Sequence, residues 1–482
     1  MVTLPFDVLD TMLKNRLIGR RDLCRLAQTS KSWHSVASQL IWETLDGISP
    51  LLQLMPTDAC RVEKIHSHSN LMSGFVFLRD LTEADWDPVY KYSTHVRHLT
   101  CDFRNVANFD SLYEPLVRCL PPRELFPSLR RFTLEPPEVD DVHAVPSFPD
   151  LLTALIPHSL TVLHISDSYL DVIDDISHIA KATPQIGSLH LQTLKTPSHE
   201  QRSQMIATPA LLPHLFDVHW FGFYDPDLLL NLSQCAHLTS ASLSFCVSGR
   251  CEFPPMPSPC FRSLRSLSIS GLTVLDVARF LDSWGVRELK EIEIELLGNA
   301  PSSADLHTLM VSLRDHCAHD TLQKISIMQL RDQPTTSLQG SHIHPLAGFS
   351  SLTYLRLDLL RGVQLSNQDY AQATRWWPRL KVCILTCPNF TKTWSGQQVA
   401  IVTPPATLET LVHFARNCTA LRQLNIPLQA CGVPYIDDDL QEMSHPLENL
   451  YLDPKIHVEE EEDAAREFVL RIFPNLGASS LF

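Results

Sequence analysis

Three histidines hold equivalent places in a repeated sequence phrase and are the first candidates for chemistry. The phrase is apolar-x-x-apolar-x-apolar, and His164, His190 and His219 each lie between its last two apolar residues. Neighbouring imidazoles bind transition metals or change charge near neutral pH, and repulsion between them opposes full protonation. Asp217 and Ser188 hold the preceding polar positions of two of these phrases. A solvated row without a ligand is the interpretation we favour, so we expect no metal and no cofactor.

A second group of candidates is a charged patch centred on three glutamates of one phrase. Alternate residues of a strand point to one face, so these glutamates share a face. Equivalent residues of the following phrases would lie beside them. Together with the three histidines, the patch forms our predicted substrate-binding set. Its members are Glu291, Glu293, Glu295, Lys324, Tyr354, Arg356 and Asp358. As a hypothesis, the patch selects a basic peptide, and a simple solvated face is the alternative.

Catalytic motifs are absent from the sequence. It contains no G-x-x-x-x-G-K-S/T, G-x-G-x-x-G, H-E-x-x-H or G-x-S-x-G. Cys246, Cys251 and Cys260 lie close together but lack the C-x-x-C spacing of a zinc site, so we interpret them as thiols. The aromatics of WFGFYDPD, from Trp220, and the pair Trp376-Trp377 are either partner anchors or core residues. We therefore expect no enzyme.

The overall composition limits the possible partners and the compartment. The 482 residues carry a net charge of −15, which disfavours nucleic acid as a partner. No run approaches the roughly 18 apolar residues of a membrane-spanning helix, so we expect no membrane partner. The 13 cysteines are scattered without paired spacing, and the first residues lack the basic and apolar regions of a signal peptide. These features predict reduced thiols and a cytoplasmic or nuclear location.

The phrase that contains the candidate residues recurs about every 29 residues, which is within the range of short structural repeats. Its last four residues alternate apolar and polar, as in a strand with one buried face. Helical patterns, such as those from Asp225, Val274 and Asp305, separate the copies. Thirteen copies begin at Val96, Leu129, Leu160, Ile186, Leu215, Leu238, Leu264, Leu289, Leu322, Leu352, Leu380, Leu421 and Leu447.

One such unit cannot cover its own apolar strand face, so neighbouring units must stack around a shared core. The predicted fold class is α/β, a solenoid with a curved parallel sheet and outer helices. This arrangement resembles leucine-rich-repeat proteins over about four fifths of the chain. The usual Asn or Cys after the strand is absent from most copies, with Cys246 an exception. A doubly wound α/β domain is the rival, but it normally uses glycine at strand–helix turns, and this chain has only 15 glycines.

The segment from residue 4 to residue 45 lacks the repeat phrase and forms a separate module. Its apolar residues follow helical spacing in three stretches, which predicts a small three-helix bundle. A bundle of about forty residues is marginally stable alone, so a partner or the first repeat should cover part of its apolar surface.

This module resembles an F-box. Leu4-Pro5 with Asp7, Val8 and Leu9 matches its opening, and Asp22-Leu23 with Leu26 its middle. Further matches are Met12, Leu13, Ser30, Lys31, Trp33, Leu40, Trp42 and Leu45, although the gap between Met12 and Asp22 is about two residues longer than usual. The segment LDGISPLLQLMP, from Leu45, resembles the segment that follows the F-box in basidiomycete-type F-box proteins.

The F-box resemblance implies a non-catalytic substrate receptor of an SCF-type ubiquitin ligase. The module would bind a Skp-type adaptor, and through it a cullin-RING ligase, while the repeats hold a protein substrate. A repeat scaffold outside any ligase is the alternative. The implied adaptor contacts are Leu4, Pro5, Val8, Leu9, Leu13, Leu23 and Leu26, with Trp33 and Trp42 nearer the module core.

The expected domain organisation has four parts. They are an F-box module at 1–45, a linker and N-terminal cap at 46–95, a solenoid at 96–457 and a capping helix at 458–482. The last segment starts with acids, which suit a helix N-terminus, and then places Phe468, Val469, Ile472 and Phe473 on one helical face. That face is predicted to close the last repeat.

Overall fold

The structure is a computed structural model, and the chain forms two compact units, residues 1–237 and 238–482. The described residues are 18–67, 70–102, 123–135, 155–166, 176–193, 197–246, 251–258, 260–296, 301–329, 337–358, 363–386, 404–429, 432–434, 445–453 and 459–476.

Every copy of the repeat phrase forms a strand, as predicted. In most phrases the apolar residues are buried and the polar residues between them are partly exposed, as in β6, where Leu163 and Ile165 alternate with His164. The thirteen strands are β4 (His98–Asp102), β5 (Arg131–Glu135), β6 (Val162–Ile165), β7 (Ser188–Gln192), β8 (Asp217–Gly222), β9 (Ser240–Phe245), β10 (Ser266–Leu272), β11 (Glu291–Leu296), β12 (Lys324–Gln329), β14 (Tyr354–Asp358), β16 (Val382–Thr386), β17 (Gln423–Pro427) and β18 (Asn449–Asp453).

These strands pair in parallel, each with the next copy of the phrase. The order is β4-β5-β6-β7-β8 in the first unit and β9-β10-β11-β12-β14-β16-β17-β18 in the second. In the first unit, β1 (Thr44–Leu45) pairs with β4, so this sheet begins one strand before the first phrase. The parallel sheets with intervening helices confirm the predicted fold class. They do not fit the doubly wound alternative, in which the strand order reverses, because here each phrase strand pairs with that of the next copy along the chain.

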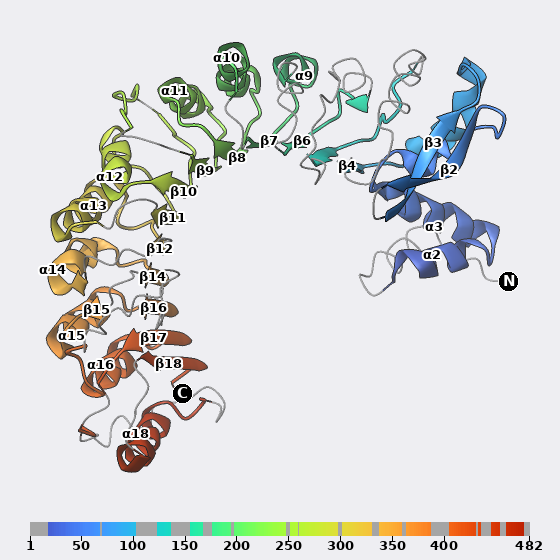
Figure 1. Cartoon of the computed structure of the whole chain (residues 1–482). Coiled ribbons are helices and arrows are strands. Elements are labelled where there is room, and N and C mark those ends of the chain that lie inside the picture. Colours follow the sequence, from blue (N-terminus) through green and yellow to red (C-terminus); the bar gives the residue numbers. More distant parts are fainter. Residues whose placement is uncertain are drawn as a thin grey trace. The chain divides into compact units, whose positions relative to one another are not determined.

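Helices connect the strands and cover one face of the sheet within each unit, and among the described residues no connecting helix lies on the other face (Figure 1). The helices bury apolar side chains. Leu228, Leu229 and Leu232 of α11 (Pro226–Gln234) and Leu306, Leu309 and Leu313 of α13 (Ser303–His316) are fully buried. The connecting helices are α9 (Ile176–Ala182), α10 (His199–Ala207), η3 (Thr208–Leu211), α11 (Pro226–Gln234), α12 (Val274–Asp282), α13 (Ser303–His316), α14 (Gly340–Ile343), η4 (His344–Gly348), α15 (Asn367–Trp376) and α16 (Glu409–Asn417). A short parallel pair, β13 (Leu338–Gln339) and β15 (Val363–Gln364), lies beside α14 and α15 in sequence.

Capping boxes start several of these helices. The Ser302 hydroxyl accepts from the amide of Asp305, and the Asp305 carboxylate accepts from the amide of Ser302, at 3.1 and 3.0 Å. Ser366 and Asp369 repeat the arrangement at α15. Both pairs satisfy amides that a helix start leaves without an intrahelical partner.

The N-terminal module contains α2 (Arg20–Ala27) and α3 (Lys31–Glu43). Leu23, Val36 and Ala37 form its buried centre, with Trp33 and Leu40 partly buried against it. The first of the three predicted helices lies in residues 1–17, outside the described residues. The helix α3 continues directly into β1, and the Trp42 ring packs against Tyr92 with centroids 4.9 Å apart. The module is therefore joined to the first repeat by continuous backbone and packing.

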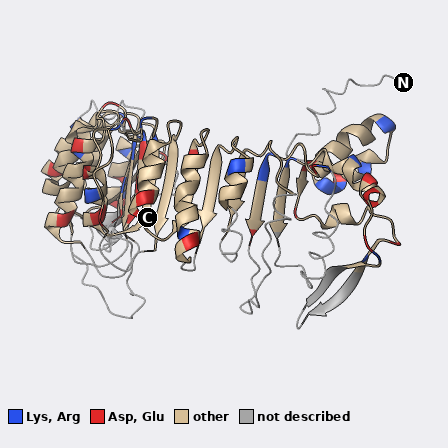
Figure 2. Cartoon of the chain, turned by 90° about the horizontal axis from the view of Figure 1, so that it is seen from above, with Lys and Arg blue, Asp and Glu red and all other residues tan. Residues whose placement is uncertain are grey.

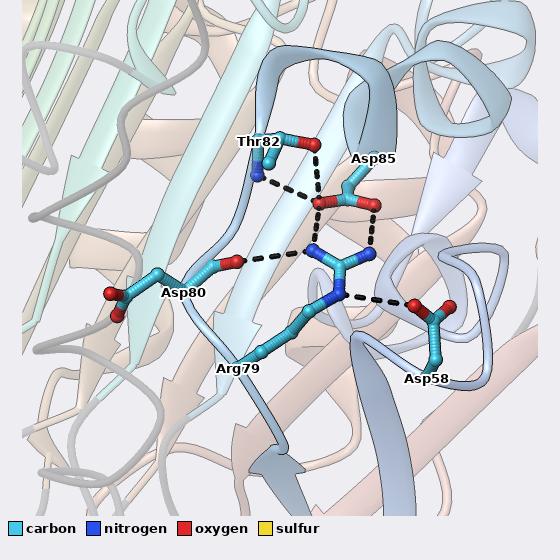
Figure 3. A network of polar contacts seen from close by, with 5 residues as sticks. All are labelled: Asp58, Arg79, Asp80, Thr82 and Asp85. Carbon is cyan, nitrogen blue, oxygen red and sulfur yellow. Dashed lines mark hydrogen bonds and ion pairs between the residues drawn. The ribbon is translucent and has the colours of Figure 1, made fainter.

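The segment between β1 and β4 contains the elements α4 (Ser49–Leu52), β2 (Cys60–Ser67), β3 (Asn70–Phe77), η1 (Glu83–Trp86) and α5 (Asp87–Ser93). The strands β2 and β3 form an antiparallel hairpin. After the hairpin, the Arg79 guanidinium donates two hydrogen bonds of 2.7 Å to the buried Asp85 carboxylate (Figure 3). The amide and hydroxyl of Thr82 donate to the same carboxylate at 2.7 and 2.8 Å. Arg79 also donates to the exposed Asp58 at 3.1 Å.

Substituting Asp85→Asn is expected to destabilise the first unit by about 2 kcal/mol, because the donors of Thr82 and Arg79 lose their buried, charged acceptor. The Arg79 hydrogen bond holds the pKa of Asp85 well below its usual range. A carboxyl with a lowered folded pKa stabilises the fold above its unfolded pKa, near 4, and this stabilisation is lost as the pH falls toward the folded value. Chemical denaturation at pH 7 measures the first effect, and its repetition at about pH 3 measures the loss with falling pH.

Asp58→Asn is the matched control, because it removes one carboxylate from the same arginine at a site where the side chain is 71% exposed. A loss below about 0.5 kcal/mol is expected there. Equal losses from the two variants would contradict a structural role for the buried pair.

At the other end, α18 (Glu459–Ile472) packs against α16. Phe468, Val469, Ile472 and Phe473 are buried, so the apolar face predicted for this helix is confirmed. The Phe473 ring meets His445 edge-on, with centroids 4.9 Å apart. The remaining domain boundaries expected from the sequence stay a prediction.

Candidate functional site

The helix-free face of each sheet carries columns of partly exposed polar side chains. Parallel pairing places His164 beside His190, and His190 beside His219. In the second unit it places Ser268 beside Glu293, and Glu293 beside Ser326. The columns predicted from the equivalent positions of the phrase are therefore present within each unit.

The histidine row contains two rings in face-to-face contact. The rings of His190 and His219 are stacked, with centroids 4.0 Å apart and planes 17° apart. The ring of His164 is tilted, with its centroid 5.3 Å from that of His190. The Asp217 carboxylate approaches the Nε2 atoms of both stacked rings. Its Oδ2 is 3.4 Å from His190 Nε2, and its Oδ1 is 3.5 Å from His219 Nε2.

A hydroxyl orients this carboxylate. Ser188 Oγ donates to Asp217 Oδ2 at 2.8 Å and lies 3.1 Å from His190 Nε2. Ser188 is buried, whereas the side chains of His190 and His219 are 30% and 46% exposed. Both imidazoles thus contact one carboxylate, which Ser188 orients, at the surface of the sheet.

The row is poorly suited to carrying several positive charges. Burial, and then repulsion from His190, lower the pKa of His164. The same two causes lower the pKa of His219, and the Asp217 charge opposes them. The mutual repulsion expected from the sequence is therefore present, and these two imidazoles are neutral near pH 7.

The charged patch also assembles on one face of three neighbouring strands. Glu291 is beside Lys324, and Lys324 is beside Tyr354. One step along the strands Glu293, Ser326 and Arg356 are in register, followed by Glu295, Met328 and Asp358. All the residues that we predicted for this patch are thus brought together.

Internal ion pairs neutralise only part of this patch. Lys324 pairs closely with Glu293 and lies 4.0 Å from Glu291, and the Glu293 hydrogen bond raises the pKa of Lys324. Arg356 donates to Asp358 at 2.9 Å. Within the part of the chain that the structure describes, no ion pair involves Glu295. The patch contains four carboxylates and two cations, so it remains acidic.

The two candidate adaptor contacts that the structure describes, Leu23 and Leu26, differ in exposure. Leu23 is only 8% exposed and packs inside the centre of the module, whereas Leu26 is partly exposed at its edge. The other candidates, Leu4, Pro5, Val8, Leu9 and Leu13, lie outside the described residues. Of the described pair, Leu26 is thus the residue available to a partner.

Basic side chains are exposed on the same two helices, although the whole chain is acidic. Arg20, Arg21, Arg25 and Lys31 are exposed on α2 and at the start of α3. Figure 2 shows Lys and Arg on these helices. Arg25 has one acidic neighbour, Asp22, at 3.6 Å, and both side chains are more than half exposed. Sequence analysis missed this local basic surface because the net charge of the chain conceals it.

The tryptophans and cysteines that the sequence analysis singled out lie partly in the core and partly at the surface. Trp220 and Trp377 are buried, and their indole nitrogens donate to the backbone oxygens of Phe223 and Leu346 at 3.1 Å. Their interpretation as partner anchors is therefore wrong. Cys251 and Cys260 are buried, and Cys246 is exposed. Among the described residues, every helix is too short or too polar to span a bilayer.

Comparison with known proteins identifies one family model, described as F-box-like, which matches residues 1–47. A search of curated proteins found no match. Among solved structures, the chain resembles the yeast Rad7 and Elc1 complex with a TM-score of 0.39 and 16% identity, over 83% of this chain and 91% of the other. The N-terminal 47 residues are thus an F-box-like domain, followed by a repeat solenoid.

Proposed function

We propose that the chain is the substrate-recognition subunit of an SCF-type cullin-RING ubiquitin ligase. The observation that carries the proposal is the F-box-like match over residues 1–47. In this role the module binds a Skp-type adaptor, and the repeats bind a protein substrate. The chemistry of ubiquitin transfer belongs to the partners. The segment LDGISPLLQLMP, from Leu45, supports our proposal that the module is of the basidiomycete type.

The surface of the module supports adaptor binding. Leu26 is partly exposed on a module that also exposes four basic side chains, so a partner with an apolar pocket and nearby acidic residues would fit it. Such contacts predict a complex that forms more slowly as the salt concentration rises. The free cysteines among the described residues support our proposal of a cytoplasmic or nuclear location.

The helix-free sheet faces support substrate binding by the repeats. Partly exposed side chains on neighbouring strands form a surface whose charge pattern can fix the register of a bound segment. The acidic patch around Glu293 fits a segment rich in Lys and Arg. The histidine row extends the set of candidate contacts to His164, His190 and His219.

Reversing the patch through Glu291→Lys, Glu293→Lys and Glu295→Lys is expected to weaken binding of Lys/Arg-rich peptides at least about tenfold. The physical reason is that attraction becomes repulsion at the contact surface. Fluorescence anisotropy with a set of labelled basic peptides measures the change.

The matched control reverses three exposed acids that lie outside the patch. Asp282, Glu288 and Asp315 have side chains 52%, 65% and 47% exposed. The triple Lys variant at these positions changes the net charge by the same amount, so it should retain most of the binding. Equal weakening by both variants would leave only a general charge effect and would rule out the patch as a site.

The test of the proposed function is reconstitution with purified partners. The full chain, a Skp-type adaptor and a cullin-RING ligase are combined, and the assembly is followed by size-exclusion chromatography. The proposal predicts that the chain enters the ligase complex only when the adaptor is present. A chain that stays separate from the adaptor would instead favour a scaffold outside any ligase.

A further inference from the structure

The strongest unassigned feature of the chain is the trio His190, Asp217 and His219. Each side chain offers one ligand atom, and the three atoms lie within 4.8 Å of one another. We propose that these residues bind a divalent transition-metal ion of the Zn²⁺ type. The inference does not depend on the ubiquitin-ligase role.

The distances within the trio match those of a coordination shell. The Asp217 oxygens lie 3.4 Å from His190 Nε2 and 3.5 Å from His219 Nε2. Zn²⁺ binds imidazole nitrogen and carboxylate oxygen at about 2.0–2.2 Å, so two ligand atoms of a tetrahedral site are about 3.3–3.5 Å apart. Both measured distances fall in this range.

The backbone holds the trio in place. His190 and His219 are in register on the paired strands β7 and β8, and Asp217 is two residues before His219, so all three side chains point to the same face. Ser188, in register with Asp217, donates to its Oδ2. A hydrogen bond of this kind orients a metal-binding carboxylate, which makes Ser188 a positioning residue.

The ligand set also indicates the class of metal. Two imidazoles and one carboxylate suit Zn²⁺ and its first-row neighbours rather than Ca²⁺ or Mg²⁺, which prefer oxygen ligands. Three protein ligands leave at least one coordination position for water or for a donor atom of a bound molecule. Because His219 is 46% exposed, that position is accessible from the helix-free face.

The test is titration of the full chain, freed of metal by a chelator, with Zn²⁺ alone, followed by calorimetry, and with Co²⁺ alone, followed by visible absorption. The proposal predicts one equivalent bound at a site whose Co²⁺ spectrum shows nitrogen and oxygen ligands without thiolate. His219→Gln and Asp217→Asn should each lower the affinity at least about tenfold. Because the His219 side chain is 46% exposed, His219→Gln should leave the stability of the fold unchanged, and a circular dichroism melt of that variant verifies this.

His164→Gln is the matched control, because it removes the next imidazole of the row, which is not one of the three ligands. It should leave the affinity unchanged. Zn²⁺ binding that survives both His219→Gln and Asp217→Asn, a thiolate signature in the Co²⁺ spectrum, or equal weakening by His164→Gln would each overturn the assignment.

Discussion

Replacing Gly271 with Ala is expected to lower the free energy of unfolding of the second unit by about 3 kcal/mol or more. Gly271 lies within β10 with a φ of +86°, where the pairing register with β11 shifts. A methyl group at this position would meet the Phe245 carbonyl oxygen at 1.8 Å and its carbonyl carbon at 2.7 Å. The end of β9 would have to move, because the obstacle is backbone and not a flexible side chain. Urea denaturation followed by circular dichroism measures the loss.

Gly432→Ala is the control that separates backbone strain from the clash. Gly432 has a φ of +70°, but no atom of the described residues lies within 4 Å of the added methyl group. It should lose only about 1–2 kcal/mol, the cost of a left-handed conformation. Similar losses at the two positions would contradict the close approach of Gly271 to Phe245. Hydrogen exchange in β9 and β10 would show whether the loss is local, since repeat proteins can unfold in parts.

The combined substitution Leu9→Asp and Leu26→Asp is expected to weaken binding of a Skp-type adaptor at least about thirtyfold. Leu26 is partly exposed at the edge of the module, and a carboxylate there would be desolvated inside an apolar contact. Leu23 is a poor choice for this test, because it is 8% exposed and an acid there would unfold α2 and α3. Isothermal calorimetry with the full chain measures the affinity.

Cys24→Asp is the matched control for this prediction. Cys24 lies on α2 two residues before Leu26 and is exposed, so it receives the same charge on a different side of the helix. Binding should stay within a fewfold of the unchanged chain. The melting of the repeats should be the same for both variants. If the double variant bound as tightly as Cys24→Asp, the module would not use these leucines.

The repeat architecture was predictable because it depends on simple periodicity. Alternation of apolar and polar residues gives a strand, and the same phrase in each unit gives the same register. For this reason, the side-by-side placement of His164, His190 and His219 followed from equivalent positions. The position of Asp217 on the same face followed as well. Its place between both Nε2 atoms depends on side-chain rotamers, which periodicity does not determine.

Other features were missed because they have no periodic signal. The strand β1 has two residues, too few for alternation to be recognised, and it follows a helix directly. Arg79 and Asp85 meet through loop geometry around Thr82. The close approach of Gly271 to Phe245 involves a single glycine in a strand phrase. Each of these contacts depends on the conformation of a few residues rather than on a pattern.

Hydrogen exchange of the full chain, with and without a purified Skp-type adaptor, tests the central proposal most directly. The proposal predicts slower exchange of the amides in residues 1–47, including α2, and unchanged exchange in the strands of the repeats. Unchanged exchange throughout residues 1–47, or protection confined to the repeat strands, would contradict adaptor binding by the F-box-like domain.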